Sequence, residues 1–258
     1  MVDIKSYDIF GNVALVKFSK NTTLSQKKKF ALKLLKNLKS VKTILEKSGK
    51  FKGRLRKQET KFIAGENTKE VIYRENDCVF RFNIDKTYFS PRLSNERKEI
   101  AGLVNKRDKV LVMFAGAAPF SIAIARKTGA RVYNNEINKE ANKYGRLNAE
   151  LNKVKDKICF VDGDIKRVAK KIKDKFDVIV MPRPQLKDSF LQEAFKLSKK
   201  GTRIFYYDFC KEDEINSVIE KVKKEAGKYG KKIKIMKVKK AGEIGPYRYR
   251  IRIDFGVM

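Results

Sequence analysis

A run of small residues, Phe114-Ala-Gly-Ala-Ala-Pro-Phe120, follows an apolar stretch, and Glu136 comes twenty residues after Gly116. A strand, a small-residue turn, a helix, a second strand and an acid form the layout of a nucleotide site. The turn lets the backbone approach a ligand, and the carboxylate accepts ribose hydroxyls. Only one glycine of a G-x-G-x-x-G fingerprint is present. We therefore predict a ligand that has a ribose and no pyrophosphate, such as S-adenosylmethionine.

Two later segments follow predicted strands and carry further candidate side chains. Asp164 follows the strand 157–161 and is placed to bind the adenine amino group. The spacing supports equally well a role as the N-cap of a helix over 165–173. The strand 176–181 ends in Met181-Pro-Arg-Pro184. A proline-rich turn at the carboxyl end of a strand belongs either to a substrate site or to a tight loop.

Several classes of chemistry are excluded because the chain contains no histidine. It therefore has no Ser-His or Cys-His dyad, no His-bound zinc and no imidazole base. Proton transfer has to be carried out by Asp, Glu, Lys, Tyr or Cys. Cys78, Cys159 and Cys210 are far apart and form no CxxC. This spacing indicates neither a disulfide framework nor a thiolate metal site, and we predict no metal.

The charge of the chain indicates a polyanionic partner. Its 258 residues include 62 Lys and Arg against 30 Asp and Glu, a formal net charge of +32, while 42% hydrophobic residues suffice for a core. A solvated basic face in a lysine-rich protein would have the same composition, but we favour nucleic acid. The basic segments 49–61 and 221–240 are candidate phosphate contacts. Because the sequence starts without signal-peptide features and has no membrane-length apolar run, we expect a cytoplasmic protein.

The elements that must position the turn and its acid are predicted from residue 108 onward. Continuous apolar strands alternate there with amphipathic helices, which is typical of a doubly wound, Rossmann-like α/β sheet covered on both faces. The final two strands, 232–239 and 247–255, are expected to form an antiparallel edge. The predicted strands are 110–114, 131–135, 157–161, 176–181 and 202–207, and the predicted helices are 120–127, 138–152, 165–173, 187–199 and 212–229.

The first part of the chain has a different pattern. It predicts a strand pair over 7–18 that turns at Gly11-Asn12, a basic helix over 24–40, a strand over 41–45 and a hairpin of 70–74 with 79–84. We therefore predict a small basic α+β RNA-binding domain over 1–85. A connecting segment over 86–104 would carry active-site residues, and 105–258 would form the catalytic domain.

Three segments together resemble one family. They are Tyr88-Phe-Ser-Pro-Arg-Leu-Ser-Asn-Glu-Arg97, Met113-Phe-Ala-Gly-Ala-Ala-Pro-Phe-Ser-Ile122 and Asn148-Ala-Glu-Leu-Asn-Lys-Val154. The family is that of the archaeal and eukaryotic-type tRNA (guanine-37-N1) methyltransferases. Glu75-Asn76, Tyr7-Asp-Ile-Phe-Gly11 and Gly242-Glu-Ile-Gly-Pro246 extend the resemblance over nearly the whole chain. It implies a class I methyltransferase fold that uses S-adenosylmethionine to methylate N1 of the guanine beside the anticodon in tRNA. We expect a monomer.

The resemblance also implies roles for individual residues. Glu96 would be the general base that removes the N1 proton, and Arg56 or Arg92 would stabilise the charge developing on the guanine oxygen. Tyr88 and Arg97 would line the pocket. The physical chemistry agrees, because N1 has to lose a proton and a carboxylate is a suitable base. The guanidinium offers the fixed fork of donors that a purine edge requires.

Without this motif, Glu96 would be interpreted as an exposed carboxylate at a helix start that pairs with nothing important. The motif favours the catalytic interpretation. The layout and the resemblance together predict two further sets of contacts. The predicted cofactor contacts are Arg97, Phe114, Gly116, Pro119, Glu136, Asp164 and Pro182, and the predicted substrate contacts are Arg183 and Pro184.

The chain departs from the family pattern at four points. Val112 stands where the family has Asp, Ala118 stands where it has a second turn glycine, and Pro182-Arg-Pro184 replaces Asn-Leu-Pro. We expect Arg183 or Gln185 to take the place of the missing amide. By this resemblance we also expect the chain to begin at the family's second domain, without the module that checks the outer corner of tRNA.

Two alternatives remain open. One is the related wybutosine-pathway enzyme, which transfers an aminocarboxypropyl group from the same cofactor to tRNA. Retention of Pro91-Arg92 and of Pro119-Phe120-Ser121 favours methyl transfer. The other alternative is a non-catalytic RNA-binding protein on a methyltransferase fold, to which the departures at 112, 118 and 182 point. Binding of labelled S-adenosylmethionine distinguishes it from both enzymes.

Overall fold

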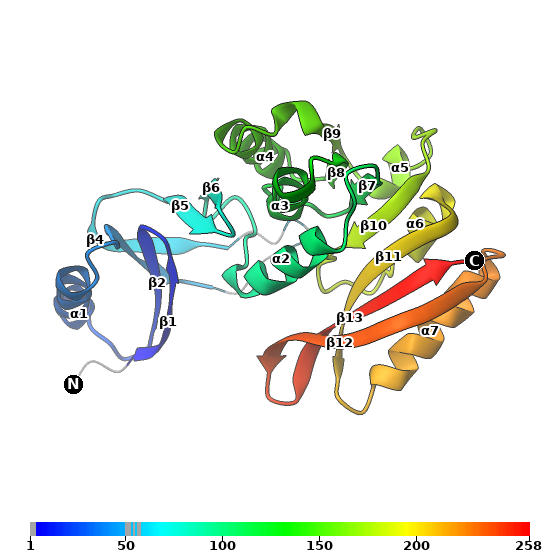
Figure 1. Ribbon diagram of the computed structural model, residues 1–258. Coiled ribbons are helices and arrows are strands. Elements are labelled where there is room, and N and C mark those ends of the chain that lie inside the picture. Colours follow the sequence, from blue (N-terminus) through cyan, green and yellow to red (C-terminus); the bar gives the residue numbers. More distant parts are fainter. Residues whose placement is uncertain (1–3, 50–52, 54, 56–57) are drawn as a thin grey trace. The chain divides into compact units, whose positions relative to one another are not determined.

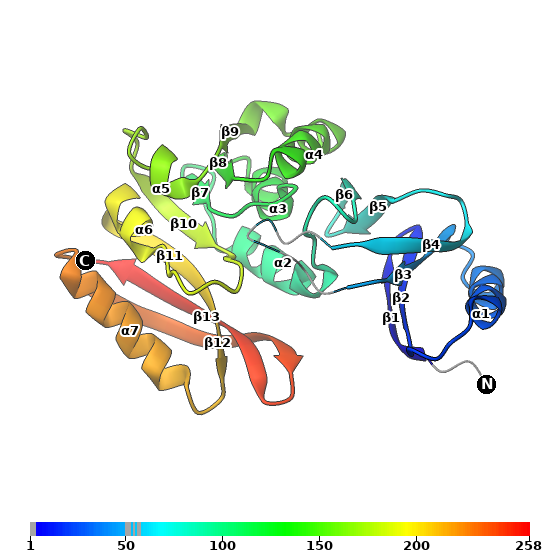
Figure 2. The ribbon, with the colours of Figure 1, turned by 180° about the vertical axis from the view of Figure 1, so that it is seen from behind.

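The computed structural model describes residues 4–49, 53, 55 and 58–258, and Arg56 therefore lies outside the described residues. The chain divides into two compact units, Met1–Pro91 and Arg92–Met258 (Figure 1, Figure 2). Among the described residues, no helix is both long and apolar enough to cross a membrane.

The first unit is built on a four-stranded sheet in the order β1-β2-β3-β4, as far as its residues are described. β1 turns into β2 at Gly11, whose φ is +55°. A Cβ there would lie 1.9 Å from the carbonyl oxygen of Ile72, so the close approach requires glycine. The helix α1 joins the parallel strands β2 and β3. The elements are β1 (Ile4–Phe10), β2 (Val13–Phe18), α1 (Leu24–Asn37), β3 (Thr43–Lys47), β4 (Thr60–Gly65) and the hairpin β5 (Glu70–Glu75) with β6 (Cys78–Asn83).

The start of α1 is encoded locally. Thr23 accepts a hydrogen bond from the N–H of Gln26, and the Gln26 side chain accepts one from the N–H of Thr23. This reciprocal pair satisfies two donors that a helix start leaves free. The helix ends at Asn37, three residues before the predicted end at 40. The strand β4 was not predicted, because it lies in a segment whose lysines and arginines hide the apolar pattern.

The second unit contains a seven-stranded sheet in the order β12-β13-β11-β10-β7-β8-β9. β9, β8, β7, β10 and β11 are parallel, while β13 is antiparallel to both β11 and β12. The predicted doubly wound sheet and its antiparallel edge are confirmed. The strands are β7 (Lys109–Val112), β8 (Arg131–Glu136), β9 (Ile158–Asp162), β10 (Phe176–Met181), β11 (Ser198–Lys211), β12 (Ile233–Gly245) and β13 (Arg248–Val257).

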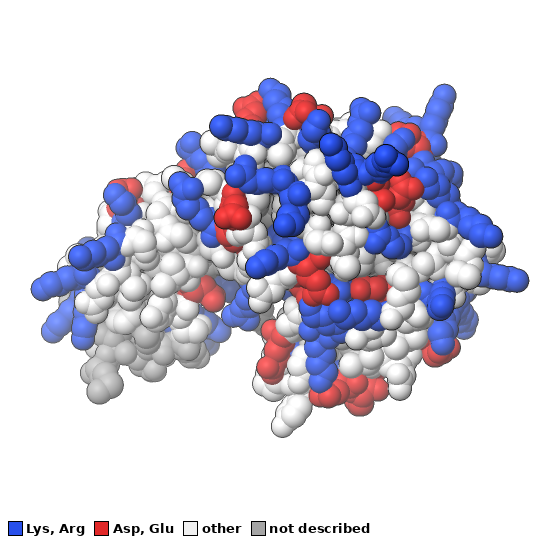
Figure 3. Space-filling model, in the orientation of Figure 1, with Lys and Arg blue, Asp and Glu red and all other residues white. Residues whose placement is uncertain are grey.

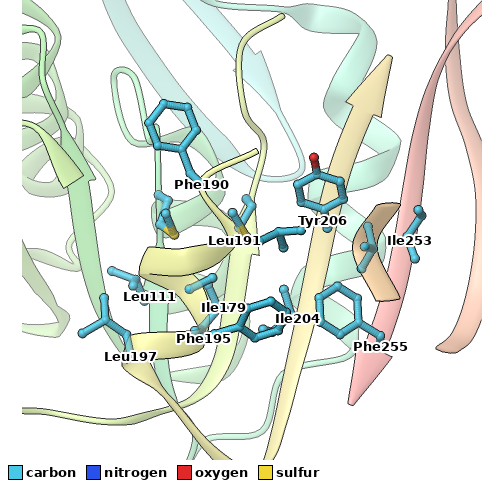
Figure 4. Packing of buried hydrophobic residues seen from close by; sticks show 14 of the residues in the cluster. Leu111, Ile179, Phe190, Leu191, Phe195, Leu197, Ile204, Tyr206, Ile253 and Phe255 are labelled. Atoms are coloured by element: carbon cyan, nitrogen blue, oxygen red, sulfur yellow. The ribbon is translucent and has the colours of Figure 1, made fainter. Parts of the chain in front are cut away.

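Helices cover both faces of this sheet because its strands are apolar on both sides. Leu111, Ile179, Ile204 and Ile253 share one face and form a core with α5, α6 and α7 (Figure 4). α2, α3 and α4 cover the opposite face (Figure 1, Figure 2). The helices are α2 (Ser94–Gly102), α3 (Pro119–Thr128), α4 (Lys139–Leu151), α5 (Ile165–Val168), α6 (Leu191–Leu197) and α7 (Ile215–Lys228), with the 3-10 turns η1 (Pro91–Leu93) and η2 (Lys155–Lys157).

Two of these helices have about half the predicted length or less, and α7 begins at Ile215, three residues after the predicted start at 212. α5 ends at Val168 and gives way to hydrogen-bonded turns as far as Lys171. α6 begins at Leu191, because Phe190 before it has a left-handed φ of +57°. The strand order reverses between β7 and β10. Ligands of open α/β sheets bind at the carboxyl ends of the strands at such a switch point.

Candidate active site

The turn that follows β7 has an unusual backbone. Phe114, Gly116 and Ala118 have φ values of +57°, +58° and +67°. Non-glycine residues rarely adopt this region, so the surrounding structure has to hold the turn. The N–H of Ala115 donates to the carbonyl of Asn135 at 2.9 Å, which fixes the turn against the end of β8. α3 then begins at Pro119.

Glu136 is the second element that holds this turn. One oxygen of its buried carboxylate accepts the N–H of Gly116 at 2.8 Å, and the other accepts the N–H of Asn138 at 2.7 Å. Burial raises the pKa of Glu136, although these backbone hydrogen bonds oppose the shift. The structure thus brings Gly116 and Glu136 together, as the layout predicted. The N–H of Ile137 also donates to this carboxylate. Three donors leave at least one of its roughly four acceptor positions for a ligand hydroxyl.

Three buried asparagines extend this network, and no individual role was predicted for them from the sequence. Asn135 donates to the carbonyls of Val161 and Gly163 at 2.9 and 3.0 Å. Asn142 donates to the carbonyl of Glu136 at 2.9 Å, and Asn148 of α4 donates to that of Ala117 at 3.1 Å. For Asn135 and Asn142 the available signal was an amide inside a strand or a helix, where amides are disfavoured. Asn148 had a second signal, because it begins one of the family segments.

The network also fits a polar ligand. Asn142 Oδ1 is buried and has no partner among the described residues. A buried acceptor without a donor is costly, and a ligand hydroxyl or amine next to Glu136 would satisfy it. The residues present at the switch point are therefore compatible with a nucleoside group.

The other predicted cofactor contacts lie at several points on the second unit. Asp164 caps α5 by accepting the N–H of Lys166 at 3.0 Å, which confirms the N-cap interpretation; its adenine contact stays a prediction. The ring of Phe114 lies 4.9 Å from that of Phe190. Pro119 is buried at the first position of α3. Arg97 is 1% exposed, and its guanidinium lies 5.8 Å from the ring centroid of Phe120.

Glu96 lies on α2 and is only 3% exposed. Its Oε2 accepts the hydroxyl of Tyr207 at 2.9 Å and Nη1 of Arg252 at 2.6 Å. Its Oε1 lies 2.7 Å from Nζ of Lys239. The interpretation of Glu96 as an exposed carboxylate without important partners is therefore wrong. Burial and the Glu96 carboxylate raise the pKa of Tyr207 well above its usual value, so its hydroxyl remains a donor.

These contacts belong to a larger group of charges, here called the Glu96 cluster. Arg252 is fully buried and donates to both oxygens of Asp254, at 2.7 and 2.9 Å, and to Glu99 at 2.7 Å. Lys239 also pairs with Glu99, and Lys237 does so at 3.2 Å. The cluster consists of Glu96, Glu99, Tyr207, Lys237, Lys239, Arg252 and Asp254.

The Glu96 cluster makes the stability of the fold sensitive to acid. The hydrogen bond from Arg252 is the main cause that lowers the pKa of Glu99 from 4.5 to about 2. A carboxyl group with a lowered folded-state pKa stabilises the fold above its unfolded-state value, and this contribution is lost as the pH falls towards 2. We expect the free energy of unfolding to decrease by at most about 3 kcal/mol between pH 4.5 and 2 for this group. Urea titrations of the wild type and Glu99→Gln should show a smaller decrease in the variant, and equal decreases would contradict the assignment.

The predicted substrate residues of the Pro182-Arg-Pro184 segment form the loop after β10. Arg183 is buried and donates to the carbonyls of Pro184 and Leu186 at 3.1 Å. It also pairs with Asp208 at 3.1 Å. Its guanidinium thus folds the loop, while the neighbouring Gln185 is exposed. Pro184 is half-buried, as is Pro182.

The remaining predicted residues fall on different parts of the chain. Arg92 is exposed in η1, at the start of the second unit, while Tyr88 is half-buried and belongs to the first unit. Arg56 lies outside the described residues. The roles of these three residues stay predictions.

A small-residue turn fixed by an acid at the switch point of a Rossmann-like sheet is the architecture of an α/β protein that binds a nucleotide or nucleoside. Residues 71–236 match the TRM5/TYW2 methyltransferase domain, and residues 2–68 match the TYW2 N-terminal domain. The chain belongs to the TRM5/TYW2 methyltransferase family, which depends on S-adenosylmethionine. This confirms the resemblance carried by the sequence motifs.

Two relatives illustrate this membership. The chain is 33% identical over 299 residues to the tRNA (guanine(37)-N(1))/4-demethylwyosine(37)-methyltransferase Taw22 of Nanoarchaeum equitans, covering 96% of this chain and 98% of that protein. It is 34% identical over 253 residues to the tRNA (guanine(37)-N(1))-methyltransferase Trm5b of Pyrococcus abyssi, covering 98% of this chain and 74% of that protein.

Solved structures agree with these relatives. The crystal structure of Pyrococcus abyssi Trm5b superposes with a TM-score of 0.86 at 33% identity, over 98% of this chain and 75% of that one. The structure of the complex of aTrm5 and tRNALeu superposes with a TM-score of 0.85 at 27% identity, over 100% of this chain and 73% of that one.

Proposed function

We propose that this protein transfers the methyl group of S-adenosylmethionine to N1 of guanine 37 in the anticodon loop of tRNA. The observation that carries the proposal is the environment of Glu96. This carboxylate of the family motif lies on α2, buried and hydrogen-bonded, directly before Arg97, whose guanidinium lies over Phe120 in the first turn of α3. α3 begins at the turn that Glu136 fixes. The candidate base and the candidate cofactor turn therefore lie on the same face of one sheet.

The residues at the switch point would hold the cofactor. Bound S-adenosylmethionine would supply an electrophilic methyl group. Glu136 would accept a ribose hydroxyl at an acceptor position that the N–H groups of Gly116, Ile137 and Asn138 leave free. Asn142 Oδ1 would accept a further ligand donor. This arrangement also weakens the non-catalytic alternative, because the turn keeps its acid despite Val112 and Ala118.

Glu96 would take the proton that guanine loses from N1. Its Oε2 accepts two donors, while Oε1 has the Lys239 ammonium as its one partner among the described residues and keeps a lone pair. A cation beside the carboxylate opposes the addition of a proton to it, so we expect one of the cations to move away. Arg252 is unsuitable because it is fully buried and held by two hydrogen bonds to Asp254. The side chain of Lys239 is 31% exposed and already contacts Glu99. We therefore assign Oε1 of Glu96 as the proton acceptor and Lys239 as the partner that moves away, towards Glu99.

The movement of Lys239 from Glu96 to Glu99 can be tested with a single and a double variant. Glu99→Gln removes the second carboxylate for Lys239 and should keep its ammonium on Glu96. We expect kcat to fall about tenfold, which corresponds to about 1.4 kcal/mol in the barrier. Adding Lys239→Met to Glu99→Gln should restore most of the loss, because the blocking cation is gone. Single-turnover rates at saturating tRNA and cofactor measure both effects. A double variant slower than Glu99→Gln would contradict this movement.

Arginines would stabilise the negative charge that develops on the guanine oxygen when N1 is deprotonated. Arg92 is exposed in η1, two residues before α2 begins and four before Glu96, and Arg56 is the second candidate. In the loop after β10, Arg183 is engaged with Leu186 and Asp208. We therefore favour the exposed amide of Gln185 over Arg183 as the substitute for the family's Asn.

The test is methylation of tRNA transcripts that differ at one nucleotide. Purified protein is incubated with methyl-labelled S-adenosylmethionine and a transcript that carries either guanine or adenine at position 37. We expect label only in the guanine transcript, and nuclease digestion should yield N1-methylguanosine. Equal labelling of the two transcripts would overturn the target assignment.

A second candidate function is favoured by two specific findings. Residues 2–68 match the TYW2 N-terminal domain, and the Nanoarchaeum relative is named for both guanine and 4-demethylwyosine at position 37. The protein would then act on a wyosine-type base, by methyl transfer or by aminocarboxypropyl transfer. Transcripts that contain 4-demethylwyosine at position 37 distinguish this function, because a guanine-only enzyme leaves them unlabelled.

A further inference from the structure

The helix α1 lies in a segment that has many lysines and no acid. Between Asp8 and Glu46 the chain contains nine lysines and neither Asp nor Glu. Five of these lysines lie within α1, whose first turn also lacks an acid. A purely solvated helix normally interleaves both signs of charge, because like charges three or four positions apart repel each other. The lysines of α1 therefore repel one another, and no acidic side chain within the segment offsets this repulsion.

The structure separates the two faces of α1. Its inward face is already used: Ala31 and Leu34 are buried, and Phe30, Leu35 and Leu38 pack on the core of the first unit. The outward face carries four exposed lysines, which we call the lysine face. Its residues are Lys28, Lys29, Lys33 and Lys36. They extend over about 12 Å along the helix, at a rise of about 1.5 Å per residue. Blue side chains project from the end of the first unit where α1 lies (Figure 3).

The lysine face also has no carboxylate partners among the described residues. Lys27, on the flank of α1, pairs with Glu46 at 2.6 Å, but no ion pair involves the four lysines of the lysine face. In the basic segment 221–240, four of the ten lysines pair with carboxylates, and Glu225 lies among the others. Lys223 pairs with Glu220, Lys237 with Glu99 and Lys240 with Glu212. The lysine face differs in lying within a stretch free of acids, since no Asp or Glu occurs between Asp8 and Glu46, and in having no carboxylate partner among the described residues.

We infer that the lysine face of α1 binds the phosphate backbone of an RNA duplex in the tRNA substrate. The inference rests on the proposed function for the identity of the RNA. Lysine ammonium groups contact phosphates as point charges and read no base sequence, so the face would position the tRNA without selecting among tRNAs. An anionic membrane is a poorer partner, because a membrane-bound helix inserts a broad apolar face. The apolar face of α1 packs on the core of the first unit, which leaves Leu24 and Leu32 as its exposed leucines.

The test replaces all four lysines by alanine, which preserves helix propensity. The matched control replaces Lys143, Lys155, Lys157 and Lys199, which pair with Glu140, Glu150, Asp156 and Asp177. Both variants lose the same charge from the full-length protein. Binding of unmodified tRNA is measured between 50 and 300 mM salt without turnover. For the lysine-face variant we expect a 10- to 100-fold weaker Kd at 100 mM salt, and a salt slope that is shallower by about 3 to 4.

The control should bind tRNA within twofold of the wild type, with an unchanged slope. Equal losses in the two variants would overturn the inference, because they would show a general charge effect. An unchanged salt slope in the lysine-face variant would also overturn the inference. So would a membrane result, in which the wild type and the control sediment with phosphatidylserine vesicles, the lysine-face variant does not, and its tRNA binding is unchanged. Failure of the proposed function is separate, since it would appear as tRNA binding without methylation.

Discussion

Glu96→Gln is expected to lower kcat for tRNA methylation by about 10²- to 10⁴-fold, the contribution typical of a positioned general base. The amide keeps the size of the side chain and can still accept the Tyr207 hydroxyl, but it cannot take the N1 proton. The affinity for S-adenosylmethionine should stay within about twofold, because Glu96 does not contact the Gly116 turn or Glu136. Single-turnover kinetics and equilibrium cofactor binding measure the two quantities.

Glu99→Gln is the matched control for this variant. Glu99 contacts Arg252 and Lys239, as Glu96 does, but it is not the assigned base. Glu99→Gln should therefore lower kcat about tenfold, and adding Lys239→Met should reverse this loss. If Glu96→Gln keeps more than a tenth of the wild-type rate, Glu96 is not the base. If both variants lose 10³-fold, the cluster acts as a unit and the assignment of one base is contradicted.

Arg252→Met is expected to have the largest effect on stability, lowering the free energy of unfolding by about 3 to 5 kcal/mol. Arg252 is fully buried and supplies two hydrogen bonds to Asp254, which is only 4% exposed. Removing the guanidinium leaves the Asp254 carboxylate buried without this partner and takes one donor from Glu96. Urea denaturation at pH 7 measures the change.

Lys237→Met is the control for the loss of a cation from the same cluster. The Lys237 side chain is 55% exposed and contacts only the outer carboxylate, Glu99, at 3.2 Å. Exposed pairs contribute little, so the stability should change by less than about 0.5 kcal/mol. An Arg252→Met variant that is as stable as the control would show that the buried pair makes no net contribution, contrary to this account.

The architecture of the second unit was predictable because its strands are apolar on both faces. The order of strands and helices after residue 108 was confirmed, as was the antiparallel edge. The lengths of α5 and α6 could not be predicted, since they depend on the left-handed conformation of Phe190 and on local turns after Val168. In the first unit, β4 was missed because the surrounding basic residues mask its short apolar pattern.

The candidate site was predictable only in part. The motif pointed to Glu96, and the spacing pointed to Gly116 and Glu136. Its other partners were not found, because Tyr207 and Arg252 lie 111 and 156 positions away along the chain. In β13, the alternation of Ile251 and Ile253 with Arg252 and Asp254 indicates a polar outer face. That face is buried instead, because α2 covers it and supplies Glu96 and Glu99 as partners.

The central claim is methyl transfer to N1 of guanine 37, and the most direct test follows both transferable groups at once. Protein and unmodified tRNA are incubated with S-adenosylmethionine labelled separately in its methyl and aminocarboxypropyl carbons, and the digested nucleosides are identified by mass spectrometry. We predict methyl label in N1-methylguanosine from position 37 and no aminocarboxypropyl label. Aminocarboxypropyl label in the RNA, or neither label together with no cofactor binding, would contradict the proposed function.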